Sequence, residues 1–320
     1  MIELADISKI DNEETTLYPI TRKIAEGTRL GIVGETGAGK STLLKIMAGL
    51  EHPDSGELFF RGEKILGPKE KLVAGHQKIA YLSQHFELPK FISVREFLNR
   101  SVQVGETRAN SLFKACDILD LLDNETRALS GGEKQRVALA QVITTSPELL
   151  ILDEPFSNLD QLHKRTIRKT LHHLSQSFVP TMILVSHDPI DVMSWADEIW
   201  VLKGGKLVQV GNPKELYYRP KNKYVAGLFG PYSLISNVGL KSDKQDHFKK
   251  IGQRYLVRPG QIQLKEAEPK RQGIVQEVLF KGSYDELFIV SEKETLIVYS
   301  EPDRYNVLDV VPISISVLPY

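Results

Sequence analysis

The stretch Gly34-Glu35-Thr36-Gly37-Ala38-Gly39-Lys40-Ser41-Thr42 decides the fold of this chain. It follows the apolar run from Leu30 to Val33, which is typical of a buried strand. It precedes residues 43–50, in which leucines and a methionine recur at the spacing of one helix face. The order of strand, glycine-rich loop and helix predicts an α/β fold with a ligand site at this junction.

The glycines of this loop allow successive backbone N–H groups to point at one anion, and the start of the helix adds the positive end of its dipole. Lys40 can then reach the terminal phosphates of a nucleotide, and the hydroxyl of Ser41 is placed to bind Mg²⁺. An ordinary glycine turn is the alternative, but the flanking strand and helix disfavour it. The loop therefore predicts a phosphate-binding site.

The composition bounds the kinds of protein that this chain can be. Its 320 residues allow two domains, and 41% hydrophobic with 26% charged residues is typical of a soluble protein. The 41 Lys and Arg residues balance the 41 Asp and Glu residues, and this removes the electrostatic reason to propose a nucleic-acid partner. The first residues do not resemble a signal peptide, and no apolar stretch approaches the roughly 20 residues that span a bilayer. We expect a cytoplasmic protein whose membrane role, if any, depends on another chain, and a single cysteine, Cys116, that packs in the core.

Two buried strands are predicted to carry polar side chains at their carboxyl ends. Leu149 to Leu152 is a continuous apolar run, as in a central parallel strand, and Asp153 and Glu154 follow it. Adjacent carboxylates point in different directions, so Asp153 can face a metal while Glu154 faces a water. A second apolar run ends at His187, which we expect on the same rim of the sheet. The other seven histidines are expected on the surface.

The middle of the chain contains a helical block at about residues 85–130, inserted after a strand that closes at Gln84. The block is followed by Ser130, Gly131 and Gly132 at the start of another helix. Taken alone, this triplet is a helix cap, but it can also form a second anion site at a helix start. A loop at 157–160 then leads into the next helix.

The end of the chain differs in character. Two short helices separated by Pro220 are predicted between Lys214 and Phe229. From about Leu234 to Tyr320 the helical periodicity disappears, and five or six short strands alternate with turns, the last of them at 313–317. This pattern predicts a small all-β barrel.

The ordered motifs resemble the ATP-binding subunit of an ABC transporter. The resemblance covers residues 1 to about 230. Gly34–Thr42 resembles the Walker A loop, Gln84 the Q-loop and Leu129–Gln135 the signature. Leu149–Glu154 resembles the Walker B strand, Ser157–Asp160 the D-loop and His187 the switch histidine. The tail is similar to the barrel that ends importer subunits of the maltose, polyamine, iron(III), sulfate and molybdate type, through Val257-Arg258-Pro259, Gly273-Ile274-Val275 and Lys281-Gly282.

The resemblance implies an α/β, P-loop NTPase fold: an ABC ATPase domain at 1–232 with an inserted helical subdomain at about 85–130, followed by a small all-β, OB-like (TOBE-type) barrel at 233–320. It implies a homodimer in which two ATP molecules are bound between the glycine loop of one chain and the signature of the other. The nucleotide-binding residues would be Gly34, Glu35, Thr36, Gly37, Ala38, Gly39, Lys40, Ser41, Thr42, Ser130, Gly131, Gly132 and Asp160.

The same resemblance implies the roles of the reacting groups. Lys40 and His187 would contact the γ-phosphate, Ser41, Gln84 and Asp153 would organise Mg²⁺, and Glu154 would polarise the attacking water; the catalytic set is thus Glu154, His187, Lys40 and Gln84. Members usually place an aromatic ring upstream of the glycine loop, whereas Ile10-Asp11-Asn12 offers none and Tyr18 lies close to the loop. We therefore expect adenine to be held by apolar contact, with loose base selectivity.

The partners implied are integral-membrane permease subunits and a solute-binding protein, without nucleic acid, at the cytoplasmic face of the membrane. The inserted helical block would carry the opening and closing of the dimer to the permease. Three alternatives remain: an exporter ATPase, a soluble ABC-type ATPase in DNA repair or translation, and a non-hydrolysing regulatory subunit. The soluble class needs a second cassette, a long coiled coil, zinc cysteines or a basic face, and none is visible. The regulatory reading is disfavoured by intact Lys40, Asp153, Glu154 and His187.

Overall fold

The structure is a computed structural model of the chain, and it describes residues 1–11, 13–157, 159–179, 181–238, 248–265 and 271–316. Asn12, Asn158 and Val317, which the sequence places in the stretch upstream of the glycine loop, in the D-loop and in the last strand, lie outside the described residues. The chain divides into two compact units, Met1–Pro213 and Lys214–Tyr320. The division falls earlier than the sequence-based boundary at 232, because the two short helices go with the second unit.

The first unit is built on a six-stranded sheet with the order β10-β9-β3-β8-β7-β6. Its strands are β3 (Arg29–Val33), β6 (Ile79–Leu82), β7 (Leu149–Asp153), β8 (Thr181–Ser186), β9 (Glu198–Lys203) and β10 (Lys206–Gly211). All neighbouring pairs are parallel except β9 with β10. Every residue of β7 and β8 is buried, as their continuous apolar sequences predict. The carboxyl ends of β3, β6, β7 and β8 therefore share one edge, where the polar residues follow.

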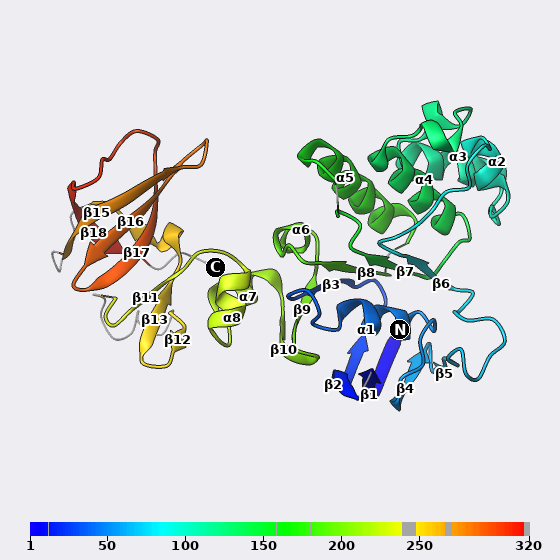
Figure 1. Cartoon of the computed structure of the whole chain (residues 1–320), viewed down its shortest axis with the longest axis horizontal. Coiled ribbons are helices and arrows are strands. Elements are labelled where there is room, and N and C mark those ends of the chain that lie inside the picture. Colours follow the sequence, from blue (N-terminus) through cyan, green and yellow to red (C-terminus); the bar gives the residue numbers. More distant parts are fainter. Residues whose placement is uncertain (12, 158, 180, 239–247, 266–270, 317–320) are drawn as a thin grey trace. The chain divides into compact units, whose positions relative to one another are not determined.

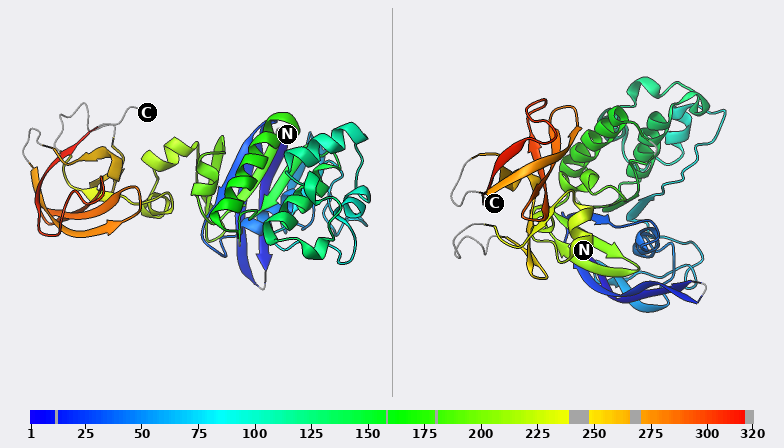
Figure 2. Two further views of the ribbon diagram at one scale, coloured as in Figure 1. Left: turned by 90° about the horizontal axis from the view of Figure 1, so that it is seen from above. Right: turned by 60° about the vertical axis from the view of Figure 1, so that its left-hand side comes forward.

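A four-stranded antiparallel sheet with the order β2-β1-β4-β5 lies over the first one. It consists of β1 (Ile2–Asp11), β2 (Glu14–Ile24), β4 (Ser55–Phe60) and β5 (Glu63–Lys64). The helix α1 (Lys40–Met47) lies between the two sheets, as Figures 1 and 2 show. Its buried leucines share one apolar core with residues of both sheets. The glycine-rich loop before α1 is thus held between two rigid layers.

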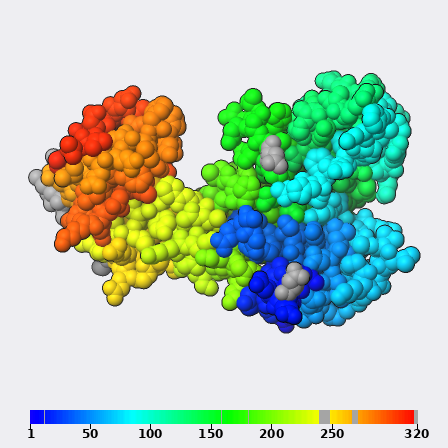
Figure 3. Space-filling view, in the orientation of Figure 1, coloured from blue at the N-terminus to red at the C-terminus, as the bar shows by residue number. Residues whose placement is uncertain are grey.

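The helical block follows β6. Its helices are α2 (Val94–Asn99) and α3 (Glu106–Ala115), with short 3₁₀ turns at Leu119–Leu121 and Thr126–Ala128. Both helices pack on α4 (Gly131–Ile143), and α3 also contacts α5 (Gln161–Ser177), while α6 (Ile190–Met193) contacts β3 and β8. Figure 3 shows residues 94–143, in cyan to green, gathered on the side of this unit away from the blue antiparallel strands. The block is therefore an insertion on the strand edge, as predicted.

The second unit contains α7 (Pro213–Tyr218), α8 (Lys223–Leu228) and two antiparallel sheets. A three-stranded sheet comprises β11 (Ser233–Ile235), β12 (Lys250–Ile251) and β13 (Arg254–Val257). A five-stranded sheet of order β14-β18-β15-β16-β17 comprises β14 (Ile262–Gln263), β15 (Arg271–Phe280), β16 (Asp285–Ser291), β17 (Glu294–Ser300) and β18 (Val310–Ile315). Its edge strands β14 and β17 contact each other, so the sheet closes almost completely around its own apolar core. The predicted small all-β, OB-like barrel is confirmed.

Arg258 explains why the two short helices go with the barrel unit. Its side chain is fully buried, and its guanidinium donates to the carbonyl oxygens of Tyr217 (2.9 Å), Ala226 (3.0 Å) and Gly230 (2.8 Å). Burial lowers the pKa of Arg258 to about 10. The guanidinium thus joins the end of β13 to the ends of α7 and α8.

Candidate nucleotide site

The glycine-rich loop runs from the end of β3 to the start of α1, as the sequence predicts. Gly39 has φ 90°, and a Cβ there would lie 2.7 Å from the carbonyl oxygen of Thr16 in β2. Gly34 is equally constrained, because a Cβ would collide with the carbonyl oxygen of Leu202. The first turn of α1 has no side-chain cap and no acidic residue, so its N–H groups and dipole face the loop. This arrangement suits an anion.

Lys40 lies inside the curve of this loop. Its side chain is 5% exposed, and its ammonium donates to the carbonyl oxygens of Gly34 (2.8 Å) and Glu35 (2.9 Å). Burial lowers the pKa of Lys40, while the charges of Glu154 and Asp153 oppose that shift. The ammonium is therefore a fixed positive charge aimed at the place that the loop encloses.

Asp153, at the end of β7, joins the loop to the neighbouring strand. Its Oδ1 accepts a hydrogen bond from Ser41 Oγ at 3.0 Å, and its Oδ2 accepts one from Tyr81 Oη at 2.9 Å. The sequence singled out Asp153 and Ser41 but not Tyr81, whose role depends on how β6 pairs with β7. Burial and the Asp153 charge raise the pKa of Tyr81, so its hydroxyl stays a donor. A hydroxyl and one carboxylate are oxygen ligands of the kind that Mg²⁺ takes together with substrate phosphates.

Glu154 and His187 meet at the same edge of the sheet. His187 Nδ1 lies 2.9 Å from Glu154 Oε2, and Gln84 Nε2 donates to that same oxygen at 3.4 Å. Glu154 has φ 48°, and its N–H donates to the carbonyl oxygen of Val185 in β8 at 3.1 Å. This backbone turn directs Glu154 toward the end of β8, where His187 follows.

A second cluster surrounds the start of α4. Ser130 caps this helix by accepting from Glu133 N, and the Glu133 carboxylate accepts from Ser130 N at 2.8 Å. Asp160 caps α5 by accepting from His163 N at 2.9 Å. A Cβ on Gly132 would collide with the His163 ring, so the two helix starts are packed together. His163, expected on the surface as an ordinary histidine, is the residue between them.

The structure therefore brings the candidate residues together in two groups. One holds the glycine loop with Lys40, Ser41, Gln84, Asp153, Glu154 and His187, and the other holds Ser130, Gly131, Gly132 and Asp160. One link between them is Gln135, which is buried and donates to the carbonyl oxygen of Pro155 next to Glu154. Helix α4 is thus attached to the residues that follow β7.

Known proteins that resemble this chain identify its family. The family described as ABC transporter matches residues 17–157. A putative ATP-binding protein of Brucella abortus (strain 2308) is 38% identical over 249 residues, covering 76% of this chain and 70% of that protein. The sulfate/thiosulfate import ATP-binding protein CysA of Synechococcus elongatus is 32% identical over 243 residues, covering 74% and 70%. The chain belongs to the ABC transporter family of ATP-binding proteins.

Other relatives extend the comparison. The maltose/maltodextrin import ATP-binding protein MalK of Yersinia pestis bv. Antiqua (strain Antiqua) is 34% identical over 236 residues, covering 72% of this chain and 63% of that protein. The dimeric ATP-binding cassette MJ0796, described as bound to ADP and Pi after hydrolysis, superposes with a TM-score of 0.58 at 25% identity over 67% of this chain and 99% of that one. Members of this family are ATPases, and so is this chain.

A buried carboxylate lies next to the strand end that carries His187. Asp191 in α6 is 1% exposed and accepts hydrogen bonds from Ser186 Oγ (2.9 Å) and from Arg168 Nη2 in α5. Ser186 immediately precedes His187. No local sequence pattern singles out Asp191, because its importance follows from contacts between three elements. It connects the D-loop helix to the strand end that carries His187.

Tyr18 lies beside the glycine loop, where the sequence placed it. Its N–H donates to the carbonyl oxygen of Gly205 at 2.9 Å, and Gly205 N donates to the carbonyl oxygen of Ala38 at 3.3 Å. The Lys206 ammonium lies over the Tyr18 ring, 4.2 Å from the ring centroid, in a cation–π contact. Ile10, in the stretch that lacks an aromatic ring, is 52% exposed.

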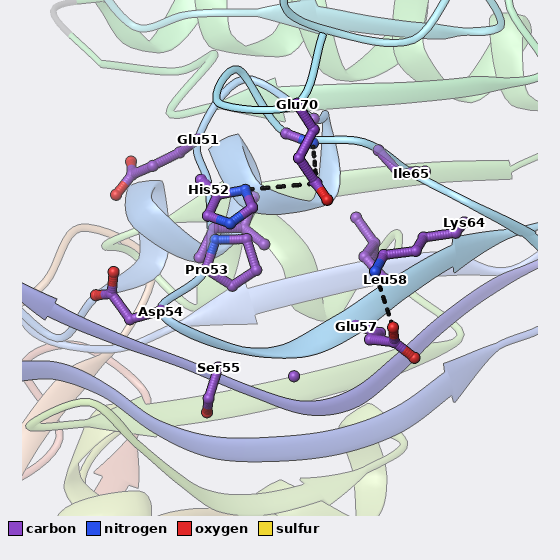
Figure 4. A pocket seen from close by; sticks show the side chains of 14 residues that line it. Glu51, His52, Pro53, Asp54, Ser55, Glu57, Leu58, Lys64, Ile65 and Glu70 are labelled. Atoms are coloured by element: carbon purple, nitrogen blue, oxygen red, sulfur yellow. Dashed lines mark hydrogen bonds and ion pairs between the residues drawn. The ribbon is translucent and has the colours of Figure 1, made fainter.

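A separate small cavity of about 140 Å³ lies beside the residues that follow α1 (Figure 4). Four of its charged or ionisable groups form pairs across it: Glu70 lies 3.7 Å from His52 Nδ1, and Glu57 lies 2.8 Å from Lys64 Nζ. Over the described ranges, no three His, Cys, Asp or Glu side chains are arranged to hold a metal ion. Over the same ranges, no helix combines the length and the apolar character needed to cross a membrane.

Proposed function

We propose that this chain is the ATP-hydrolysing subunit of an ABC importer, working as a homodimer on separate permease subunits at the cytoplasmic face of a membrane. The observation that carries the proposal is the meeting of Glu154, His187 and Gln84 at the edge of the sheet where the glycine loop lies. Two relatives described as import ATP-binding proteins, for sulfate/thiosulfate and for maltose/maltodextrin, support the importer class. A solute-binding protein on the other side of the membrane would deliver the solute.

The proposed reaction is attack of water on the γ-phosphate of ATP. Lys40 and the N–H groups of the glycine loop bind the phosphates and offset their charge, and His187 contacts the γ-phosphate. Glu154 accepts the proton of the attacking water. Ser41, Asp153 and Gln84 would hold Mg²⁺, which when bound neutralises part of the phosphate charge.

The proposed dimer follows from the two groups of residues. Each chain carries one glycine loop and one signature cluster of Ser130, Gly131, Gly132 and Asp160, in which Gly132 packs against the His163 ring and Asp160 accepts from His163 N. Pairing the loop of one chain with the signature of its partner would complete each site and make ATP part of the interface. The dimeric state described for the cassette MJ0796 supports this arrangement. Residues 85–130 would transmit closure to the permease, and residues 233–320 form the accessory barrel.

The experiment that tests this function is isolation of the chain from detergent-solubilised membranes of its own host, followed by identification of the chains that accompany it. We expect a polytopic membrane protein in fixed ratio, and ATP turnover in proteoliposomes that rises when one solute and its binding protein are added. Solute movement out of cells rather than inward would identify an exporter. Salt-sensitive recovery with DNA or ribosomes, without a membrane partner, would support the soluble class of ABC ATPase.

A further inference from the structure

We propose that the cavity between α3 and α5 is a binding site for a small phosphate ester, separate from the ATP site. Its volume is about 640 Å³, which lies in the range of roughly 300–1,000 Å³ that is usual for small-molecule sites. Its walls come from the inserted helical block and from the D-loop helix. None of the lining residues is among the candidate nucleotide-site residues.

Two lysines that line the cavity are without an ion-pair partner in the part of the chain that the structure describes. Lys114 on α3 and Lys169 on α5 line it from two different helices, and neither makes an ion pair within the described residues. The one acidic residue of the lining, Asp117, lies 4.0 Å from Arg136 Nη2. His173 adds a third nitrogen group. A bound anion would offset the charge of both ammonium groups.

The helix α5 as a whole favours an anion. Its sequence, QLHKRTIRKTLHHLSQS, contains four Lys or Arg residues and no Asp or Glu. Two of them, Lys164 and Arg168, face Asp191 and are thereby compensated. Lys169, which lines the cavity, has no such carboxylate partner among the described residues. The positive charge at the cavity wall is therefore a property of this helix and not of one isolated side chain.

The floor of the cavity holds a hydroxyl suited to a phosphate oxygen. Thr170 is 4% exposed and lines the cavity, and its side chain makes no hydrogen bond within the described residues. Two other hydroxyls of the lining, Ser111 and Thr166, donate to carbonyl oxygens of their own helices at 3.0 and 3.2 Å. Thr170 is thus the hydroxyl that remains available. An oxygen of a phosphate bound in the cavity would accept a hydrogen bond from it.

The remaining lining residues would contact the organic part of the ligand. Ala115 and Phe178 are apolar, and the Phe178 ring lies 6.0 Å from the His173 ring. Two lysines match the charge of about −2 and the several acceptor oxygens of a phosphate monoester. The volume far exceeds the roughly 30 Å³ that a water occupies, so the cavity has room for a small carbon skeleton beside the phosphate.

The test is isothermal titration of the full chain, with its nucleotide site saturated by ADP and Mg²⁺, using fructose 1,6-bisphosphate, ribose 5-phosphate and glycerol 3-phosphate as probes. We expect saturable 1:1 binding of at least one probe, at least tenfold weaker in the double variant Lys114→Gln/Lys169→Gln. The matched control Lys23→Gln/Lys90→Gln removes two exposed lysines elsewhere in the unit and should bind as the unmodified chain does. Basal ATP turnover should be unchanged in all of them.

A second variant, Thr170→Val, keeps the volume and both charges but removes the hydroxyl, and it should weaken binding several-fold. It tests the site independently if the double variant unfolds. Absence of saturable binding with all three probes, equal affinity in Lys114→Gln/Lys169→Gln and its control, or competition by unphosphorylated fructose would each overturn the assignment. None of these outcomes depends on whether the chain drives import.

Discussion

His187 Nδ1 lies 2.9 Å from Glu154 Oε2, although 33 residues separate the two in the sequence. The contact arises because β7 and β8 are parallel neighbours and both side chains follow the carboxyl ends of these strands. Each residue therefore fixes the orientation of the other at the edge where the glycine loop binds phosphate in our proposal.

Replacing Glu154 by Gln should separate binding from hydrolysis. The amide has nearly the same shape but cannot accept the proton of the attacking water, so the turnover rate should fall by about 10²- to 10⁴-fold while ATP still binds. The variant should also accumulate as a dimer with ATP. Phosphate release and light scattering measure the two effects, with Glu87→Gln, an exposed carboxylate elsewhere, as control. A monomer at saturating ATP would contradict the shared site.

Tyr81→Phe should weaken metal binding without unfolding the chain. It removes the hydroxyl that donates to Asp153 at 2.9 Å, and a hydrogen bond to a charged group contributes about 1.5–3 kcal/mol. The Asp153 carboxylate then loses part of its orientation, and the Mg²⁺ concentration for half-maximal turnover should rise by about tenfold. Titration of Mg²⁺ after EDTA treatment measures this, and Tyr305→Phe in the barrel unit should leave the curve unchanged. An unaltered Mg²⁺ dependence would show that Tyr81 only packs.

Asp191→Asn should reduce both stability and turnover. The substitution leaves Arg168 without its buried charged partner, which typically costs about 3–5 kcal/mol. It also loosens Ser186, so the turnover rate should fall more than the affinity for ATP. Thermal unfolding and steady-state kinetics measure the two effects. The control is Asp197→Asn, which breaks a more exposed pair with Arg29 and should cost less than about 1 kcal/mol. Similar losses in the two variants would refute a special role for Asp191.

The nucleotide base should be recognised loosely. No aromatic residue lies in the stretch around Ile10, so ATP and GTP should be hydrolysed with catalytic efficiencies within about tenfold of each other, or about 1.4 kcal/mol. Ile10→Tyr should tighten ATP binding by about 1 kcal/mol through stacking, whereas Leu72→Tyr, at another exposed position, should not. Strong rejection of GTP by the unmodified chain would mean that other groups read the base.

Arg258→Leu should destabilise the barrel unit selectively. The carbonyl oxygens of Tyr217, Ala226 and Gly230 would lose their shared donor, and each buried unpaired group costs about 1–3 kcal/mol. Limited proteolysis should then cut near α7 and α8 sooner than in the unmodified chain. Arg254→Leu, an exposed neighbour in β13, is the control. Equal protection of both variants would argue that packing alone holds these helices.

Local patterns predicted much of this protein correctly. The apolar runs before Gly34, Asp153 and His187 identified three buried parallel strands, because strands covered on both faces must be apolar throughout. The close spacing of turn residues in the tail predicted the small barrel, because short strands separated by turns are typical of all-β folds. These properties depend on the period of a strand or helix and on residues adjacent in the chain, so they can be read without knowledge of the rest of the fold.

The sequence by itself thus determined the phosphate loop, the strand ends that carry the polar residues and the β-rich tail. Only the tertiary structure decided that Tyr81 holds Asp153, that Asp191 supports Ser186, that Arg258 binds α7 and α8, and that Lys114 and Lys169 line one cavity. These contacts join elements far apart in the chain, and their geometry follows from strand order and helix packing. Side chains of ordinary types acquire such roles only through the neighbours that the fold gives them.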